Sequence, residues 1–165
     1  MVPEFTAVMS NTTIVLLPTA IRAATTEDAR FVAKNLREDD QLELCAMGHS
    51  DISAAVMQSF ERSCFVRVAT INGVPAILYG VGKSAGETGI PWMLATPAIS
   101  IFSRAFVRGC RHEVEQMQGM FPKLANMVHH NNKTAMRWLQ WLGFVIHSSH
   151  RIGPGGQFYL FTMGI

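Results

Sequence analysis

The sequence predicts a single domain of mixed α/β fold, in which one mixed sheet carries helices on its faces. Two observations lead to this fold class. Apolar segments of strand length alternate with amphipathic helical segments along the whole chain, and 165 residues are enough to enclose one hydrophobic core. No repeat or low-complexity linker divides the chain. We therefore expect one domain over residues 20–165, with residues 1–19 as a leader, a first strand or a cloning remnant.

Composition excludes several functional classes. Hydrophobic residues make up 48% of the chain and charged residues only 16%, which is typical of a folded protein. A net charge of +2 gives no sign of binding to nucleic acid or to a membrane surface. No apolar run approaches the roughly 20 residues that span a bilayer, and the N-terminus lacks the pattern of a secretory signal. We therefore expect a cytoplasmic protein.

The cysteines point to no metal site and no disulfide. Cys45, Cys64 and Cys110 are an odd number, lie far apart, and include no Cys-x-x-Cys pair. This usage predicts reduced and mostly buried thiols.

The first half of the chain begins with a strand and two helical segments. Residues 14–25 are apolar and β-branched enough for a strand. Thr25 and Asp28 have the spacing of a capping box and open a helix that extends to about Leu36. A second helical stretch covers about 41–60, interrupted near 48–51, where Ser50 or Asp51 could cap a restart.

The middle of the chain predicts a β-hairpin followed by another strand. Residues 64–71 alternate apolar and polar positions, Asn72-Gly73 is a tight-turn sequence, and residues 74–82 return as the second strand. Residues 90–95 follow as a short apolar strand.

The last part predicts a helix over 99–117, a strand over 123–128, and a helix over 132–142, followed by two more strands. Asn131 or Asn132 is expected to cap the second of these helices, whose inner face includes Trp138, and Gly143 to end it. The final apolar strand, 158–165, is predicted at a sheet edge, where it could pair with a second copy and form a homodimer.

Two segments carry a family resemblance. Residues 21–36 ("IRAATTEDARFVAKNL") resemble the opening strand and helix of the GNAT-type N-acetyltransferases, and residues 131–146 ("NNKTAMRWLQWLGFVI") resemble their closing helix and strand. Residues 36–48 and 89–97, with the later "RWLQWLGF", look more narrowly like the GNAT-like proteins of short-tailed bacteriophages, some of which are labelled internal virion proteins. The resemblance covers roughly residues 20–165.

This resemblance implies a GNAT-like fold and an acetyl-CoA site. In that fold the fourth and fifth strands are parallel and splay apart, leaving a slot for the pantetheine arm; here those strands would be residues 90–95 and 123–128. The resemblance therefore predicts binding of acetyl-CoA near that slot and near the helix that follows it. The expected cofactor-binding residues are Met93, Leu94, Ala95, Thr96, Ser100, Arg104, Asn131 and Asn132.

The chain departs from the family pattern at the diphosphate loop. Family members use Gln/Arg-x-x-Gly-x-Gly/Ala, whereas residues 95–100 ("ATPAIS") contain no glycine, and Pro97 lacks a backbone N–H. A basic stripe follows at Arg104, Arg108 and Arg111, which could attract CoA phosphates or an acidic partner, or could simply be a solvated helix face.

A second departure concerns proton transfer. The tyrosine that many family members use as general acid aligns with Leu139. His129 and His130, which follow the 123–128 strand, and Glu87, in the loop before the 90–95 strand, are the candidate catalytic residues. Each of the three also has an ordinary structural interpretation, as a capping, solvent-facing or loop residue.

Two functions therefore remain open from the sequence. One is transfer of acetyl from acetyl-CoA to an amine, on a protein that could belong to a bacterial host. The other is a GNAT-shaped protein without catalysis, acting by binding as a virion component or as a modulator of a host protein. The scaffold favours the first, and the two departures favour the second.

Overall fold

The structure is a computed structural model that describes residues 4–10, 13–102 and 104–164. The strands are β1 (Glu4–Ser10), β2 (Thr13–Ala23), β3 (Ser63–Ile71), β4 (Val74–Lys83), β5 (Thr88–Ala95), β6 (Lys123–His129), β7 (Val145–Ile152) and β8 (Phe158–Met163). The helices are α1 (Thr26–Lys34), α2 (Glu38–Ala46), α3 (Ile52–Arg62), α4 (Arg104–Gly109), α5 (Arg111–Met120) and α6 (Lys133–Leu142). Two short 3-10 turns are η1 (Pro97–Ile101) and η2 (Pro154–Gly156).

The strands form one sheet in the order β1-β2-β3-β4-β5-β6-β8-β7. Every neighbouring pair is antiparallel except β5 and β6, which are parallel. The predicted mixed sheet, with one parallel pair formed by the "IPWMLA" and "KLANMV" segments, is confirmed. Strand β2 runs through the expected domain boundary at residues 19 and 20.

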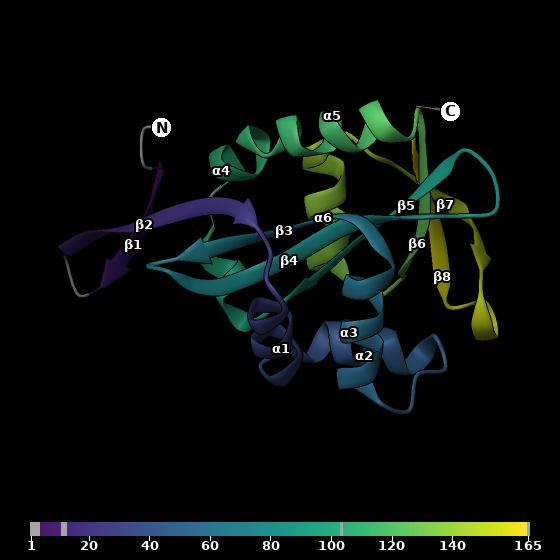
Figure 1. The fold of residues 1–165 in the computed structure, drawn as a ribbon, viewed down its shortest axis with the longest axis horizontal. Coiled ribbons are helices and arrows are strands. Elements are labelled where there is room, and N and C mark those ends of the chain that lie inside the picture. Colours follow the sequence, from purple (N-terminus) through teal and green to yellow (C-terminus); the bar gives the residue numbers. More distant parts are fainter. Residues whose placement is uncertain (1–3, 11–12, 103, 165) are drawn as a thin grey trace.

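Helices cover both faces of the sheet, as predicted. Figure 1 shows α1, α2 and α3 on one side of the strands and α4 and α5 on the other. The core under α1–α3 includes Val32, Val56 and Leu78, all fully buried. On the opposite face, α6 joins α4 and α5, and Trp138 is only 6% exposed there.

Local signals explain where several elements begin and end. Thr25 and Asp28 form the predicted capping box of α1, and Asp51 caps α3. Asn72 and Gly73 both have positive φ, 50° and 78°, as a tight hairpin turn between β3 and β4 requires. Gly143 adopts the left-handed conformation that ends α6.

The helix predicted over 99–117 is divided. Pro97 starts the 3-10 turn η1, and Phe102 at its end has an extended backbone, with ψ of 133°. Cys110 separates α4 from α5 with ψ near −2°. The residues at helical spacing along this segment are nevertheless all buried, because the two helical pieces continue in nearly the same direction (Figure 1): they are Phe102, Phe106, Cys110, Val114 and Met117.

Two expectations were wrong. The final strand β8 lies between β6 and β7 rather than at the sheet edge, so its backbone groups pair within the chain and the argument for a homodimer through that strand falls. Cys45 and Cys64 are exposed, and only Cys110 is buried. Cysteine spacing reports on pairing but not on the face of a helix or strand that the thiol occupies.

Candidate functional site: the opening between β5 and β6

The parallel strands β5 and β6 separate soon after they begin. They share two register pairs, Thr88 with Lys123 and Gly89 with Leu124. Beyond these pairs, the Nδ2 of Asn126 on β6 donates a hydrogen bond to the backbone oxygen of Pro91 on β5, at 2.9 Å. A side chain thus bridges the strands where the backbone ladder has ended, and the rest of the β5 edge faces an opening.

The backbone of Met93 is turned into that opening. At the end of β5, the N–H of Ala95 donates to Oδ2 of Asp40 at 2.8 Å, and its C=O accepts from the N–H of Arg37 at 2.9 Å. Because backbone groups in a strand alternate in direction, the N–H and C=O of Met93 point the same way as those of Ala95. Within the described ranges, no residue outside the strand ladder bonds to either Met93 group.

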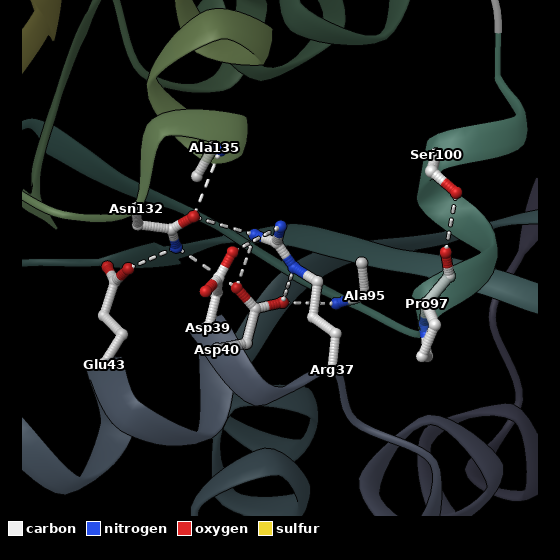
Figure 2. A network of polar contacts seen from close by, with 9 residues as sticks. All are labelled: Arg37, Asp39, Asp40, Glu43, Ala95, Pro97, Ser100, Asn132 and Ala135. Carbon is white, nitrogen blue, oxygen red and sulfur yellow. Dashed lines mark hydrogen bonds and ion pairs between the residues drawn. The ribbon is translucent and has the colours of Figure 1, made fainter.

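A buried charge network closes the end of the opening beside Ala95 (Figure 2). Arg37, the residue before α2, donates from Nε to Oδ2 of Asp40 at 2.9 Å and from Nη2 to Oδ1 at 2.6 Å. Its Nη2 also reaches Oδ1 of Asn132, at 3.1 Å. All three side chains are buried. The exposed Asp39 lies at 3.7 Å from the Arg37 guanidinium.

Asn132 joins this network to the start of α6. As the predicted N-cap, its Oδ1 accepts from the N–H of Ala135 at 3.2 Å, besides the bond from Arg37. Its Nδ2 donates to Oε2 of Glu43 at 2.6 Å and to Oδ1 of Asp40 at 3.3 Å. A side-chain amide has two donors and two acceptor sites, so the amide of Asn132 is fully used inside the protein.

Glu43 is the one member of the network that has no cationic partner. Among the described residues, no Lys, Arg or His nitrogen forms an ion pair with its carboxylate. Burial raises the pKa of Glu43, and the nearby charge of Asp40 raises it further. The hydrogen bond from Asn132, a backbone bond from His129 and the charge of that histidine oppose these effects.

A cavity of about 500 Å³ extends along the opening and is lined by residues from both faces of the sheet. On the α2–α3 side it is lined by Glu43, Leu44, Met47, Ala55 and Trp92. On the α4–α6 side it is lined by Met93, Cys110, Val114, Trp138 and Leu139. A concave, mostly apolar space with a few polar groups is typical of a small-molecule site.

A second polar group borders the cavity under α5. Arg67 of β3 forms an ion pair with Glu113, Nε to Oε2 at 3.3 Å. The buried hydroxyl of Tyr79 has no hydrogen bond that meets normal geometry, although Glu113 lies beside it. Burial raises the pKa of Tyr79, and the charge of Glu113 adds to the effect, so the phenol keeps its proton at neutral pH.

The loop after β5 uses its backbone amides internally. Oγ1 of Thr96 accepts from the N–H of Ala98, and the N–H groups of Ile99 and Phe102 donate to the carbonyls of Thr96 and Ile99. Oγ of Ser100 donates to the carbonyl of Pro97 at 3.1 Å (Figure 2). These amides do not form the open, glycine-lined cradle that a diphosphate needs.

The predicted site residues fall into separate groups. Met93, Leu94 and Asn132 line the cavity, and Ala95 lies at its end. Thr96 caps η1 and Ser100 lies within it, whereas the side chain of Arg104 is outside what the structure describes. Asn131 is exposed, and Glu87 lies exposed in the β4–β5 loop.

His129 and His130 lie side by side at the β6–α6 junction, with their ring planes tilted by 32°. Their ring centroids are 4.7 Å apart, and both rings bond to Gln157 rather than line the cavity. The described residues include no group of three or more His, Cys, Asp or Glu side chains arranged to bind a metal ion.

Arg37, Asp40 and Glu43 were missed by sequence reasoning. A signal for them does exist in the segment 36–48. In α2, Asp40 is 3% exposed while Leu42 is 59% exposed, so a charged residue takes the inward position and an apolar one faces solvent. Charges at a spacing of three on the inner face of a helix indicate a buried polar network.

Comparison with known proteins identifies the fold. No family model and no curated protein sequence matches the chain, but solved structures do. An aminoglycoside acetyltransferase in complex with coenzyme A aligns with a TM-score of 0.61 and 14% identity, over 88% of this chain and 94% of its own. The ribosomal-protein-S18-alanine N-acetyltransferase of Escherichia coli gives 0.55 and 14%, over 88% and 92%.

A GNAT-family acetyltransferase from Streptococcus pneumoniae aligns with a TM-score of 0.53 and 15% identity, over 88% of this chain and 98% of its own. The described helices include none that is long and apolar enough to cross a membrane. The parallel pair that separates and the helices on both faces agree with these alignments. The chain has the fold of the GNAT acetyltransferases.

Proposed function

We propose that this protein transfers an acetyl group from acetyl-CoA to an amine. The observation that carries the proposal is the Met93 backbone, whose N–H and C=O face an opening between parallel strands inside a cavity of about 500 Å³. An extended ligand that contains amides can add to such an edge as a further strand would. Acetyl-CoA supplies the acetyl group as a thioester at the end of an amide-containing arm.

The residues around the opening fit that arm. The Asp40–Ala95 and Arg37–Ala95 bonds occupy the last peptide groups of the β5 edge, and Asn126 occupies the carbonyl of Pro91. The edge groups left for a ligand are therefore those of Met93. Leu94 and the apolar cavity wall would exclude water from the reacting end, which strengthens polar interactions there.

The fit is weaker for the diphosphate of acetyl-CoA. The η1 amides are already bonded, and Phe102 packs against Phe106 and Trp138 between α4 and α6, with centroid distances of 4.4 and 6.1 Å. We propose that Thr96, Ser100 and Arg104 contact the phosphates from their side chains, and that the arm provides most of the affinity. Asn131 is exposed, and we propose that it adds a further contact to the cofactor.

The acceptor is proposed to be a protein amine, which could belong to a bacterial host. Two of the structural neighbours support this class by their names, as acetyltransferases of alanine in ribosomal proteins S18 and S5. The aminoglycoside enzyme supports a small-molecule amine instead. All of these acceptors react through an amine nitrogen. Acetylation of an amine is therefore the activity that we propose for this chain.

A second function is favoured by different observations. The Asn132 amide is fully bonded within the protein, the η1 amides are used, and Leu139 stands at the tyrosine position. These features support a protein of the same fold that binds a partner without catalysis, in a virion or on a host protein.

Thermal melting separates the two functions. Acetyl-CoA at about 100 times its Kd should stabilise the fold by roughly 2.7 kcal/mol, which raises Tm by several degrees. S-acetyl-pantetheine should raise Tm as well if the arm provides most of the affinity. Absence of any shift with millimolar acetyl-CoA would overturn the enzyme proposal and leave the binding protein.

A Ser100→Glu variant tests the phosphate contacts. Ser100 is exposed, so the substitution should leave the fold intact. Its carboxylate should repel the phosphates and weaken acetyl-CoA, while S-acetyl-pantetheine binds as before. Equal weakening of both ligands would contradict the proposed place of the diphosphate.

A further inference from the structure

We propose that Glu43 binds the ammonium group of the acceptor and takes up its proton. This inference rests on the proposed function and adds to it the residue that prepares the nucleophile. It also names the acceptor class, a cationic amine that enters the cavity from the α2–α3 side.

The first argument is charge compensation. A carboxylate that is largely removed from water, as that of the part-buried Glu43 is, is normally paired with a cation, because an unpaired charge away from solvent is costly. Within the same network Arg37 is engaged by Asp40, with bonds of 2.9 and 2.6 Å. In the described part of the chain no Lys, Arg or His nitrogen forms an ion pair with Glu43, and the charge of His129 acts on it without such a contact. The missing cation is what an acceptor ammonium would supply.

The second argument is position. Glu43 lines the cavity from α2, and Figure 2 shows its side chain directed toward Asn132 at the start of α6. Asn132 holds the carboxylate through the 2.6 Å bond from Nδ2 to Oε2. Asn132 is itself fixed by Arg37 and by the α6 amide of Ala135. Glu43 is therefore held in one orientation before any ligand arrives, which favours proton transfer.

The surrounding charges suit a base. Burial has the largest effect on the pKa of Glu43 and raises it, and the charge of Asp40 on α2 raises it further. The Asn132 amide and the charge of His129, both from the β6–α6 junction, lower it. Arg37 faces Asp40 instead. A carboxyl group with a raised pKa is a stronger base than an exposed one, and the ideal catalytic pKa lies near the working pH.

The step balances as follows. Glu43 takes one proton from the ammonium and becomes neutral. The lone pair of the amine nitrogen forms the bond to the acetyl carbon, the carbon–sulfur bond breaks, and its electron pair stays on sulfur. The nitrogen gives up its second proton, which leaves with the thiol, and Glu43 returns its proton to water. The products are the N-acetyl amine and free CoA thiol.

The ammonium site can be tested without acetyl-CoA. In protein labelled with carbon-13 at the glutamate carboxyls, the Glu43 signal is assigned by its loss in Glu43→Gln. Propylammonium chloride should shift this signal and lower its titration midpoint, because a nearby cation favours the carboxylate. Propanol with matched sodium chloride should leave the midpoint unchanged. A Glu43 midpoint that propylammonium does not move, or that sodium chloride moves equally, overturns the site.

Proton transfer is tested with a mixture of peptides with free amines, read by mass spectrometry. Glu43→Gln should lower the rate of acetylation about 10²- to 10⁴-fold, the usual effect of losing a general base. It should also remove the pH dependence of the rate that the ionisation of Glu43 causes in the wild type. The Tm shift with acetyl-CoA should persist. Glu38→Gln, which changes an exposed carboxylate on the same helix, is the matched control and should act like the wild type.

The two proposals can fail separately. If acetyl-CoA does not raise Tm, or the wild type acetylates no amine, the proposed function is wrong, and proton transfer by Glu43 falls with it. If acetyl-CoA binds and amines are acetylated, but Glu43→Gln retains the wild-type rate, only the role of Glu43 is wrong.

Discussion

Oδ2 of Asp40 lies 2.8 Å from the backbone nitrogen of Ala95, so a side chain from α2 occupies the edge of β5 at the end of the opening. The same carboxylate pairs with the buried guanidinium of Arg37. One residue thus joins the helix, the strand edge and, through Asn132, the start of α6. The geometry of the open β5 edge depends on this junction.

Replacing Asp40 by Ala should destabilise the fold strongly. It leaves Arg37 buried without its carboxylate and frees the amide of Ala95, and breaking a buried pair on one side costs about 3–5 kcal/mol. Urea unfolding followed by circular dichroism measures the loss. Asp39→Asn is the matched control, since Asp39 is half exposed at 3.7 Å from Arg37, and should change stability by about 0.5 kcal/mol or less. Similar losses in both variants would contradict the buried network.

Gly80 and Gly82 on β4 should respond very differently to alanine. A Cβ at Gly80 would collide with the backbone oxygen of Phe65 and lie 3.1 Å from the Trp92 ring, whereas at Gly82 the nearest atom is 3.9 Å away. The backbone of β3 cannot move aside without breaking the sheet. Gly80→Ala should therefore cost about 3 kcal/mol, as strong overpacking does, and Gly82→Ala should be close to neutral. Thermal and urea unfolding of the two variants gives the comparison.

Asp28 should make the stability of the fold depend on acid pH. Hydrogen bonds from Arg22, aided by bonds from Thr25, lower the pKa of Asp28 below its ordinary value near 3.8. A lowered folded-state pKa means that the stabilisation is present above the ordinary value and is lost as pH falls through the folded value. Asp28→Asn should cost about 1–2 kcal/mol at pH 7, the size of a capping effect. Urea unfolding at pH 7 and at a series of pH values below the ordinary value should show the difference shrink as the pH falls; a constant difference would contradict the assignment.

The scaffold was predictable because its signals are local. The Thr25–Asp28 capping box, the Asn72-Gly73 turn and the Gly143 helix end each depend on a few neighbouring residues, and all three appear where the sequence predicts them. The break of the 99–117 helix was missed. Its apolar spacing continues through Phe102 and Cys110, and periodicity reports on the buried face rather than on the continuity of hydrogen bonds.

The candidate site was much less predictable. Its central contacts join residues about ninety positions apart, such as Arg37 with Asn132, and no local pattern encodes such a pairing. The N-cap role of Asn132 was found from its position before α6, while its bond to Glu43 was not. The order of the last strands was missed for the same reason: strand length and apolarity do not say which neighbour β8 will have.

Glu43→Gln should stabilise the fold. Burial raises the pKa of Glu43, so the folded state holds that proton to higher pH than the unfolded state does. Stability should then fall as pH rises from the ordinary glutamate value through the folded value, because ionisation costs the folded state more. Glutamine has no charge to bury, and its oxygen can still accept from Nδ2 of Asn132. The variant should gain about 1 kcal/mol at neutral pH, typical of a stabilising change at a strained functional site, and little below the ordinary value. Urea unfolding against pH measures both; an equal gain at every pH, or a loss at pH 7, would contradict an uncompensated carboxylate at this position.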